Sequence, residues 1–192
     1  METPSPETRS HDDGEGPRAF AVFGLGNPGE RYLRTRHNLG FLLVERLVDR
    51  LGARPRGDTP DAIHHEARLE GFELHLLRPL TWMNRSGLAV ESFLARMELD
   101  PDQMLVAVDD AAIDLGRLRL RPKGSHGGHN GLRSVEERLG GEDYTRLRMG
   151  CGPAPEEEDL ADFVLGEFAA EDDGAVDELL DRAADEVCSW IL

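Results

Sequence analysis

The stretch Ala19-Phe20-Ala21-Val22-Phe23-Gly24-Leu25-Gly26-Asn27-Pro28-Gly29 joins an apolar run to a glycine-rich loop. The apolar run predicts a buried β-strand, and the glycines let the backbone after it pass close to a neighbouring segment or a ligand. Asn27 lies in this loop, and His37 and Asn38 follow soon after it. A loop that brings an imidazole and two carboxamides to the end of a strand predicts a functional site at that end.

The same glycines match the dinucleotide-binding pattern G-x-G-x-x-G, which is specific only when a helix begins within the pattern. Here Pro28 disfavours a helical conformation for Asn27, and the polar segment 30–37 delays the next helix. We therefore expect no nicotinamide cofactor, and the loop is interpreted as part of a site of another kind.

The length of 192 residues suits one well-buried domain. Residues 1–17 are polar and acidic and lack the hydrophobic region of a secretory signal, so we expect a disordered tail there and a folded domain over 18–192.

The sequence holds no apolar run long enough to cross a membrane. Its two cysteines, Cys151 and Cys188, are too few for a disulfide framework and fit a reducing cytoplasm.

The net charge of −16 is distributed unevenly. Residues 1–17 carry net −4 and residues 154–192 carry net −13, so the part between them is close to neutral at +1. Within it, residues 115–135 hold no acid. A local basic stripe of this kind either is a solvated strand face or attracts a phosphate backbone. Its bases are Arg117, Arg119, Arg121, Lys123 and Arg133.

Strand and helix patterns alternate along the chain. We predict strands at 19–23, 65–69, 72–77, 104–108, 117–121 and 146–150, with 65–69 and 72–77 as a hairpin and 54–60 as a turn region. We predict helices at 38–51, capped by Asn38, at 88–97, at 132–139 and at 176–191. This order predicts an α/β fold: a single-domain three-layer sandwich whose twisted sheet is mixed, mostly parallel, with helices on both faces. In such sheets, sites lie at the carboxyl ends of strands, where Asn27, Asn84 and Asp109 are expected.

These polar residues suit hydrolysis by activated water. A histidine can take a proton from water near neutral pH, and a carboxylate on its other nitrogen would stabilise the imidazolium. Carboxamides can bind a carbonyl or a developing oxyanion. The sequence has no G-x-S-x-G nucleophile elbow. Each residue also has a purely structural reading: Asn27 and Asn130 as turn residues, Asn84 as a helix cap and Asp109 as a strand-end turn residue.

The remaining histidines receive no such role. His126 and His129 have a poor spacing for metal ligands, and we expect no metal site. His11, His64, His65 and His75 are interpreted as tail or surface residues.

Taken together, these motifs resemble the bacterial peptidyl-tRNA hydrolase family, in the same order from about residue 20 to 168. The resemblance rests on the motifs Gly24-Leu25-Gly26-Asn27-Pro28-Gly29-Glu30-Arg31-Tyr32, Thr35-Arg36-His37-Asn38-Leu39-Gly40-Phe41, Pro79-Leu80-Thr81-Trp82-Met83-Asn84-Arg85-Ser86-Gly87, Val108-Asp109-Asp110, Gly127-Gly128-His129-Asn130-Gly131-Leu132 and Asp162-Phe163-Val164-Leu165.

The resemblance implies an enzyme that hydrolyses the ester between a peptide and the 3′ ribose of tRNA, without a covalent intermediate. It implies that His37 is the base that acts on water, and that Asp109 orients it. It further implies that Asn27 and Asn84 hold the peptide backbone and the 3′ adenosine, and that Asn130 positions the water or the oxyanion. Met83 would line the site, Tyr32 would contact the 3′ end, and four bases would contact the tRNA: Arg119, Arg121, Lys123 and Arg148.

A non-catalytic RNA-binding relative of the same fold is the alternative. The intact set of polar residues favours the enzyme: Asn27, His37, Asn84, Asp109 and Asn130. We expect a monomer with no obligate protein partner, since the sequence shows no obvious exposed apolar surface.

Overall fold

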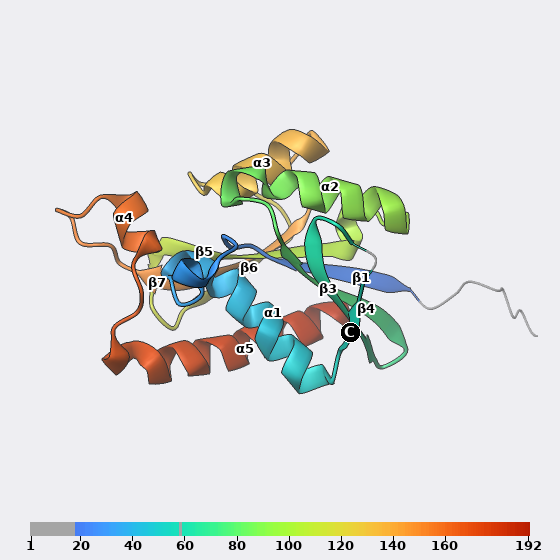
Figure 1. Ribbon diagram of the computed structural model, residues 1–192, viewed down its shortest axis with the longest axis horizontal. Coiled ribbons are helices and arrows are strands. Elements are labelled where there is room, and N and C mark those ends of the chain that lie inside the picture. The colour runs from blue at the N-terminus through green and yellow to red at the C-terminus, as the bar shows by residue number, and fades with distance from the viewer. Residues whose placement is uncertain (1–17, 58) are drawn as a thin grey trace, which may run out of the picture.

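The apolar run of the first motif forms strand β1 (Ala19–Gly24) within a seven-stranded sheet of the computed structural model, which describes residues 18–57 and 59–192 (Figure 1). Phe20 and Val22 pack in one hydrophobic cluster, and Ala21 and Phe23 pack in a second cluster. The strand is therefore buried on both faces, which is why its sequence is continuously apolar.

The strands are ordered β2-β3-β4-β1-β5-β7-β6 in the sheet. The four strands β4, β1, β5 and β7 run parallel, while β2, β3 and β6 add antiparallel pairings at the two margins. The predicted α/β class and mixed sheet are confirmed. The other strands are β2 (Arg54–Arg56), β3 (Ala62–Leu69), β4 (Phe72–Pro79), β5 (Met104–Asp114), β6 (Leu118–Arg121) and β7 (Thr145–Gly152).

Two layers of helices enclose the sheet, as predicted. Helices α1 (Leu39–Leu51) and α5 (Asp173–Ile191) cover one face, and α2 (Ser86–Met97) and α3 (Asn130–Leu139) cover the other (Figure 1). The short helix α4 (Leu160–Leu165) lies at one end of the molecule, away from both layers (Figure 1).

Two glycines of the first loop are required by packing. A Cβ on Gly24 would lie 2.0 Å from the carbonyl oxygen of Gly40 in α1, and a Cβ on Gly26 would lie 2.7 Å from the ring of Phe41. The loop and the helix could not approach this closely with larger residues. The match to the dinucleotide pattern therefore reflects contact between β1 and α1.

Three sequence expectations need correction. Strand β5 continues to Asp114, so Asp109 lies inside a strand and not in a turn after it. The turn region 54–60 contains the short strand β2. His64 and His75 are buried on paired strands of the hairpin, packed against Phe93, and are not surface residues.

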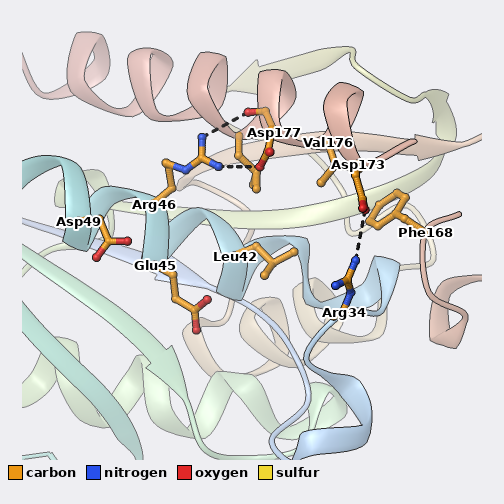
Figure 2. A pocket seen from close by; sticks show the side chains of 10 residues that line it. Arg34, Leu42, Glu45, Arg46, Asp49, Phe168, Asp173, Val176 and Asp177 are labelled. Atoms are coloured by element: carbon orange, nitrogen blue, oxygen red, sulfur yellow. Dashed lines mark hydrogen bonds and ion pairs between the residues drawn. The ribbon is translucent and has the colours of Figure 1, made fainter. Parts of the chain in front are cut away.

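Helices α1 and α5 are joined by ion pairs along a groove of about 450 Å³ (Figure 2). Arg46 pairs with Asp177 at 2.9 Å and with Asp181, and Arg34 pairs with Asp173 at 3.2 Å. Part of the acidic charge near the C-terminus is thus neutralised by α1 and the segment before it.

The predicted tail 1–17 lies outside the described residues, as does His11. Within the described part of the chain, none of the helices has the length and apolar character needed to cross a bilayer.

Candidate active site

His37 and Asp109 meet at the centre of the candidate site. His37 lies in a single 3-10 turn, η2 (Arg36–Asn38), just before α1, and Asp109 lies in β5. Nδ1 of His37 is 2.8 Å from Oδ1 of Asp109, and their side chains are 11% and 2% exposed. The sequence predicted this pair, and the fold brings the two residues together across 72 positions of the chain.

His129 is a third member of this cluster that sequence reasoning missed. Its Nε2 lies 3.1 Å from the same Oδ1 of Asp109. Its Nδ1 accepts hydrogen bonds from the backbone N–H groups of Gly131 and Leu132 at the start of α3. Nδ1 is therefore unprotonated, and Nε2 carries the proton that His129 donates to Asp109. The available signal was its position directly before Asn130 in a second glycine-rich loop, residues 124–131, called here the second glycine loop.

Asp109 is ionised at neutral pH. Burial by itself raises the pKa of this carboxyl, but the facing imidazoles of His37 and His129 outweigh burial and hold the pKa well below its ordinary value. A carboxylate can only accept hydrogen bonds, so Nδ1 of His37 is the protonated nitrogen of its neutral ring. Nε2 of His37 is then the basic atom.

The three residues also have the composition of a metal site, with ligand atoms within 4.8 Å of one another. A cation bound between them would need unprotonated nitrogens facing Asp109. The two amide bonds to Nδ1 of His129 instead require a proton on the nitrogen that faces Asp109. The arrangement therefore fits a hydrogen-bond network better than a cation site.

Asn27 and Asn38 lock the first loop beside His37. The Asn38 side chain accepts from the N–H of Asn27 at 2.8 Å and donates to its carbonyl at 3.0 Å. The predicted capping role of the Asn38 side chain is therefore wrong: α1 begins after this residue, but the side chain bonds to the loop and not to the helix. The bonds fix the Asn27 backbone next to the turn that carries His37.

The Asn27 side chain joins this loop to the segment after β4. Its Oδ1 accepts from the N–H of Met83 at 2.9 Å. This bond fixes the orientation of the Asn27 amide, whose Nδ2 is the donor that can bind a carbonyl. Met83 and Asn84 lie in a 3-10 turn, η3 (Met83–Arg85), with Met83 buried and Asn84 exposed.

These residues surround a cavity of about 910 Å³. One side consists of α4 and the segment before it, which the sequence did not assign to the site. Tyr32, a predicted site residue, is not among the lining residues; its ring is edge-on to Trp82, which is, at a centroid distance of 6.0 Å. The predicted site residues that line the cavity are Asn27, His37, Met83, Asn84, Asp109, Asn130 and Arg148.

The basic residues divide into two groups. Arg119 and Arg121 are exposed on β6 at the sheet margin, and Lys123 is exposed just beyond it. Arg148 lies opposite Arg119 in the register of β6 and β7, but it is largely buried. It donates to Asp110 at 3.1 Å and to the carbonyl of Ser125 at 2.9 Å, so it also braces the second glycine loop.

Fold and site together define a class: an α/β protein with a histidine–carboxylate pair and several carboxamides around a large cavity. The family described as "Peptidyl-tRNA hydrolase" matches residues 21–192. A peptidyl-tRNA hydrolase of Aquifex aeolicus is 42% identical over 164 residues, 84% of each chain. One of Desulforudis audaxviator is 44% identical over 163 residues, 85% of this chain and 82% of that protein.

Solved structures agree with the sequence relatives. The structure of a peptidyl-tRNA hydrolase in complex with N-propanol superposes with a TM-score of 0.83 at 35% identity, covering 93% of this chain and 91% of that one. The chain belongs to the peptidyl-tRNA hydrolase family, a family of hydrolases.

Proposed function

We propose that this protein hydrolyses the ester between a peptide, or an N-blocked amino acid, and the 3′ ribose of tRNA. The observation that carries the proposal is the His37–Asp109 pair, with Asp109 buried and His37 lining a large cavity, in a chain of this family. The products would be free tRNA and the released peptide.

In the proposed reaction, Nε2 of His37 takes a proton from water while the oxygen of that water attacks the ester carbonyl. Asp109 stabilises the imidazolium through its 2.8 Å bond to Nδ1. When the tetrahedral intermediate collapses, the bond to the ribose oxygen breaks and the imidazolium returns its proton to that oxygen. No protein atom becomes acylated.

The carboxamides would bind the reacting groups. Asn130 is the first residue of α3, and Arg133 lies 3.5 Å from its Oδ1, so its amide nitrogen can serve a developing oxyanion at a positively polarised helix end. Asn27 would donate to a peptide carbonyl, and Asn84 would hold the 3′ adenosine beside Met83 and Tyr32.

The basic residues would bind the tRNA through its phosphates. Arg119, Arg121 and Lys123 offer exposed charges along one margin of the sheet, and Arg148 extends them to the cavity. Recognition would then depend on tRNA shape and phosphates, with little reading of bases.

We further propose that the catalytic domain spans residues 18–192, acts as a monomer in the cytoplasm and uses no cofactor or metal. The hydrogen-bonded set of His37, Asp109 and His129 supplies a base, a charge and a fixed tautomer from the chain alone.

The proposal is tested by incubating the purified protein with N-acetyl-aminoacyl-tRNA in EDTA and measuring the release of free tRNA. We expect multiple turnovers, and much slower release from the same tRNA carrying an unblocked amino acid. Saturable tRNA binding without hydrolysis would contradict the proposal and favour the non-catalytic RNA-binding relative.

A further inference from the structure

Helix α4 forms an apolar wall of the cavity. Leu160 and Leu165 are 59% and 41% exposed, and both line the cavity together with Val164. Exposed leucines on a cavity wall can bind an apolar ligand group. Since α4 lies outside the two helical layers (Figure 1), its position depends on the few contacts that hold it.

Arg36 supplies the central contact. Its Nη1 donates to the carbonyl of Phe163 in α4 at 3.1 Å. Its guanidinium lies over the Phe163 ring, 4.2 Å from the centroid, and 5.3 Å from the centroid of Phe168. Phe163 is buried, so α4 presents one side to Arg36 and the other to the cavity. Cation–π contacts of this kind strengthen when they are shielded from water.

The backbone next to Arg36 binds the chain just after α4. The N–H of Arg36 donates to the carbonyl of Gly166 at 3.0 Å, and Thr35 forms an isolated antiparallel bridge with Glu167. A Cβ at Gly166 would lie 2.9 Å from Nη1 of Arg36, so glycine leaves room for the guanidinium.

Arg36 directly precedes His37 in the same 3-10 turn. One residue thus connects the apolar wall to the turn that carries the proposed base. We propose that Arg36 is a positioning residue: it sets α4 relative to His37, and so favours substrates whose peptide has a bulky apolar side chain next to the ester. This inference rests on the proposed function for its substrate, but the placement of α4 is measurable without substrate.

The first test is hydrogen exchange of the protein alone, comparing wild type with Arg36→Ala and Arg36→Gln. We expect the amides of 161–166 to exchange roughly tenfold faster or more in both variants, while α5 keeps its protection. Arg34→Ala is the matched control, because Arg34 bonds to Asp173 beside Phe168 and not to α4 (Figure 2). Unchanged exchange in α4 would overturn the proposal.

The second test compares tRNA carrying N-acetyl-leucine with tRNA carrying N-acetyl-glycine. For Arg36→Ala and Arg36→Gln we expect kcat/KM to fall roughly 10- to 100-fold with the leucyl substrate, and less than about threefold with the glycyl substrate. Thermal denaturation verifies that both variants fold. An equal loss with both substrates would show that Arg36 acts on His37 alone and would overturn the specificity role. Failure of the wild type to hydrolyse either substrate would instead refute the proposed function, whatever the exchange result.

Discussion

Two regions of the protein combine histidines with a carboxylate and differ in where those histidines lie. His37 and His129 meet Asp109 beside a cavity of about 910 Å³. His75 meets Glu73 within the β3–β4 hairpin, and His64 meets His75; the rings of His64 and His75 pack against Phe93 at centroid distances of 5.1 and 5.4 Å.

In the hairpin, a directional chain of contacts fixes the histidines. Arg96 donates to Oγ1 of Thr59 at 2.8 Å, and Thr59 lies 3.4 Å from Nδ1 of His64. Nε2 of His64 is 3.1 Å from Nδ1 of His75, whose Nε2 is 3.3 Å from Glu73. An arginine can only donate, so the Thr59 hydroxyl is left to donate to Nδ1 of His64, and Nε2 of His64 then donates to Nδ1 of His75.

The difference shows why composition alone does not locate a site. Both nitrogens of His64 and of His75 face protein atoms, whereas His37 uses Nδ1 for Asp109 and belongs to the cavity lining. Chemistry requires a basic nitrogen that a ligand can reach. We therefore expect substitutions in the first cluster to change the rate and substitutions in the second to change stability.

The largest effect is expected for Asp109→Asn. The amide can still accept from both histidines through one oxygen, but it lacks the charge that stabilises the imidazolium. We expect kcat to fall roughly 10²- to 10⁴-fold with little change in tRNA affinity. Asp114→Asn, an exposed substitution on the same strand, is the control for hydrolysis of N-acetyl-aminoacyl-tRNA. Near-wild-type kcat in Asp109→Asn would remove Asp109 from the mechanism.

A smaller effect is expected for Arg119→Ala combined with Arg121→Ala. Loss of two phosphate contacts should raise KM about tenfold, leave kcat nearly unchanged and reduce the log–log slope of KM against salt by about 2. Arg54→Ala combined with Arg68→Ala removes equal charge from exposed positions at the opposite sheet margin. An identical response of both double variants would mean that net charge, and not a local contact, attracts the tRNA.

Substitution in the second cluster should leave the rate almost unaffected. His75→Leu removes one buried ring from the chain and leaves His64 with an unmet hydrogen bond, at a cost of about 1–3 kcal/mol. For each kcal/mol by which the free energy of unfolding falls, we expect Tm to fall by roughly 2–4 °C. We expect kcat/KM to stay within about twofold of wild type. A selective loss of kcat at unchanged Tm would show that the hairpin histidines take part in catalysis.

The smallest effect concerns stability at acid pH. Because the folded-state pKa of Asp109 lies below its unfolded value, its ionisation stabilises the fold above about pH 4. That contribution is lost as the pH falls through the lower, folded-state pKa. In urea unfolding, the stability difference between wild type and Asp109→Asn should therefore shrink below about pH 4. A difference that stays constant from pH 6 to pH 2 would contradict this assignment.

The sequence predicted the sheet, the enclosing helices and seven of the residues that line the cavity, because apolar periodicity and loop motifs are local signals. It did not assign His129, since the shared bond to Asp109 depends on β5 and α3 approaching in space. It misplaced His64 and His75, because burial of a hairpin face depends on α2 packing over it. It also missed α4, which is held against Arg36 by a contact between residues 127 positions apart in the chain.

The central claim is that His37, and not another histidine, activates the attacking water. The direct test is release of free tRNA from N-acetyl-aminoacyl-tRNA in EDTA by wild type and His37→Ala, with tRNA affinity measured in parallel. We predict a rate roughly 10²- to 10⁴-fold lower in His37→Ala and a Kd for tRNA within about twofold of wild type. A rate close to wild type in His37→Ala would contradict the account.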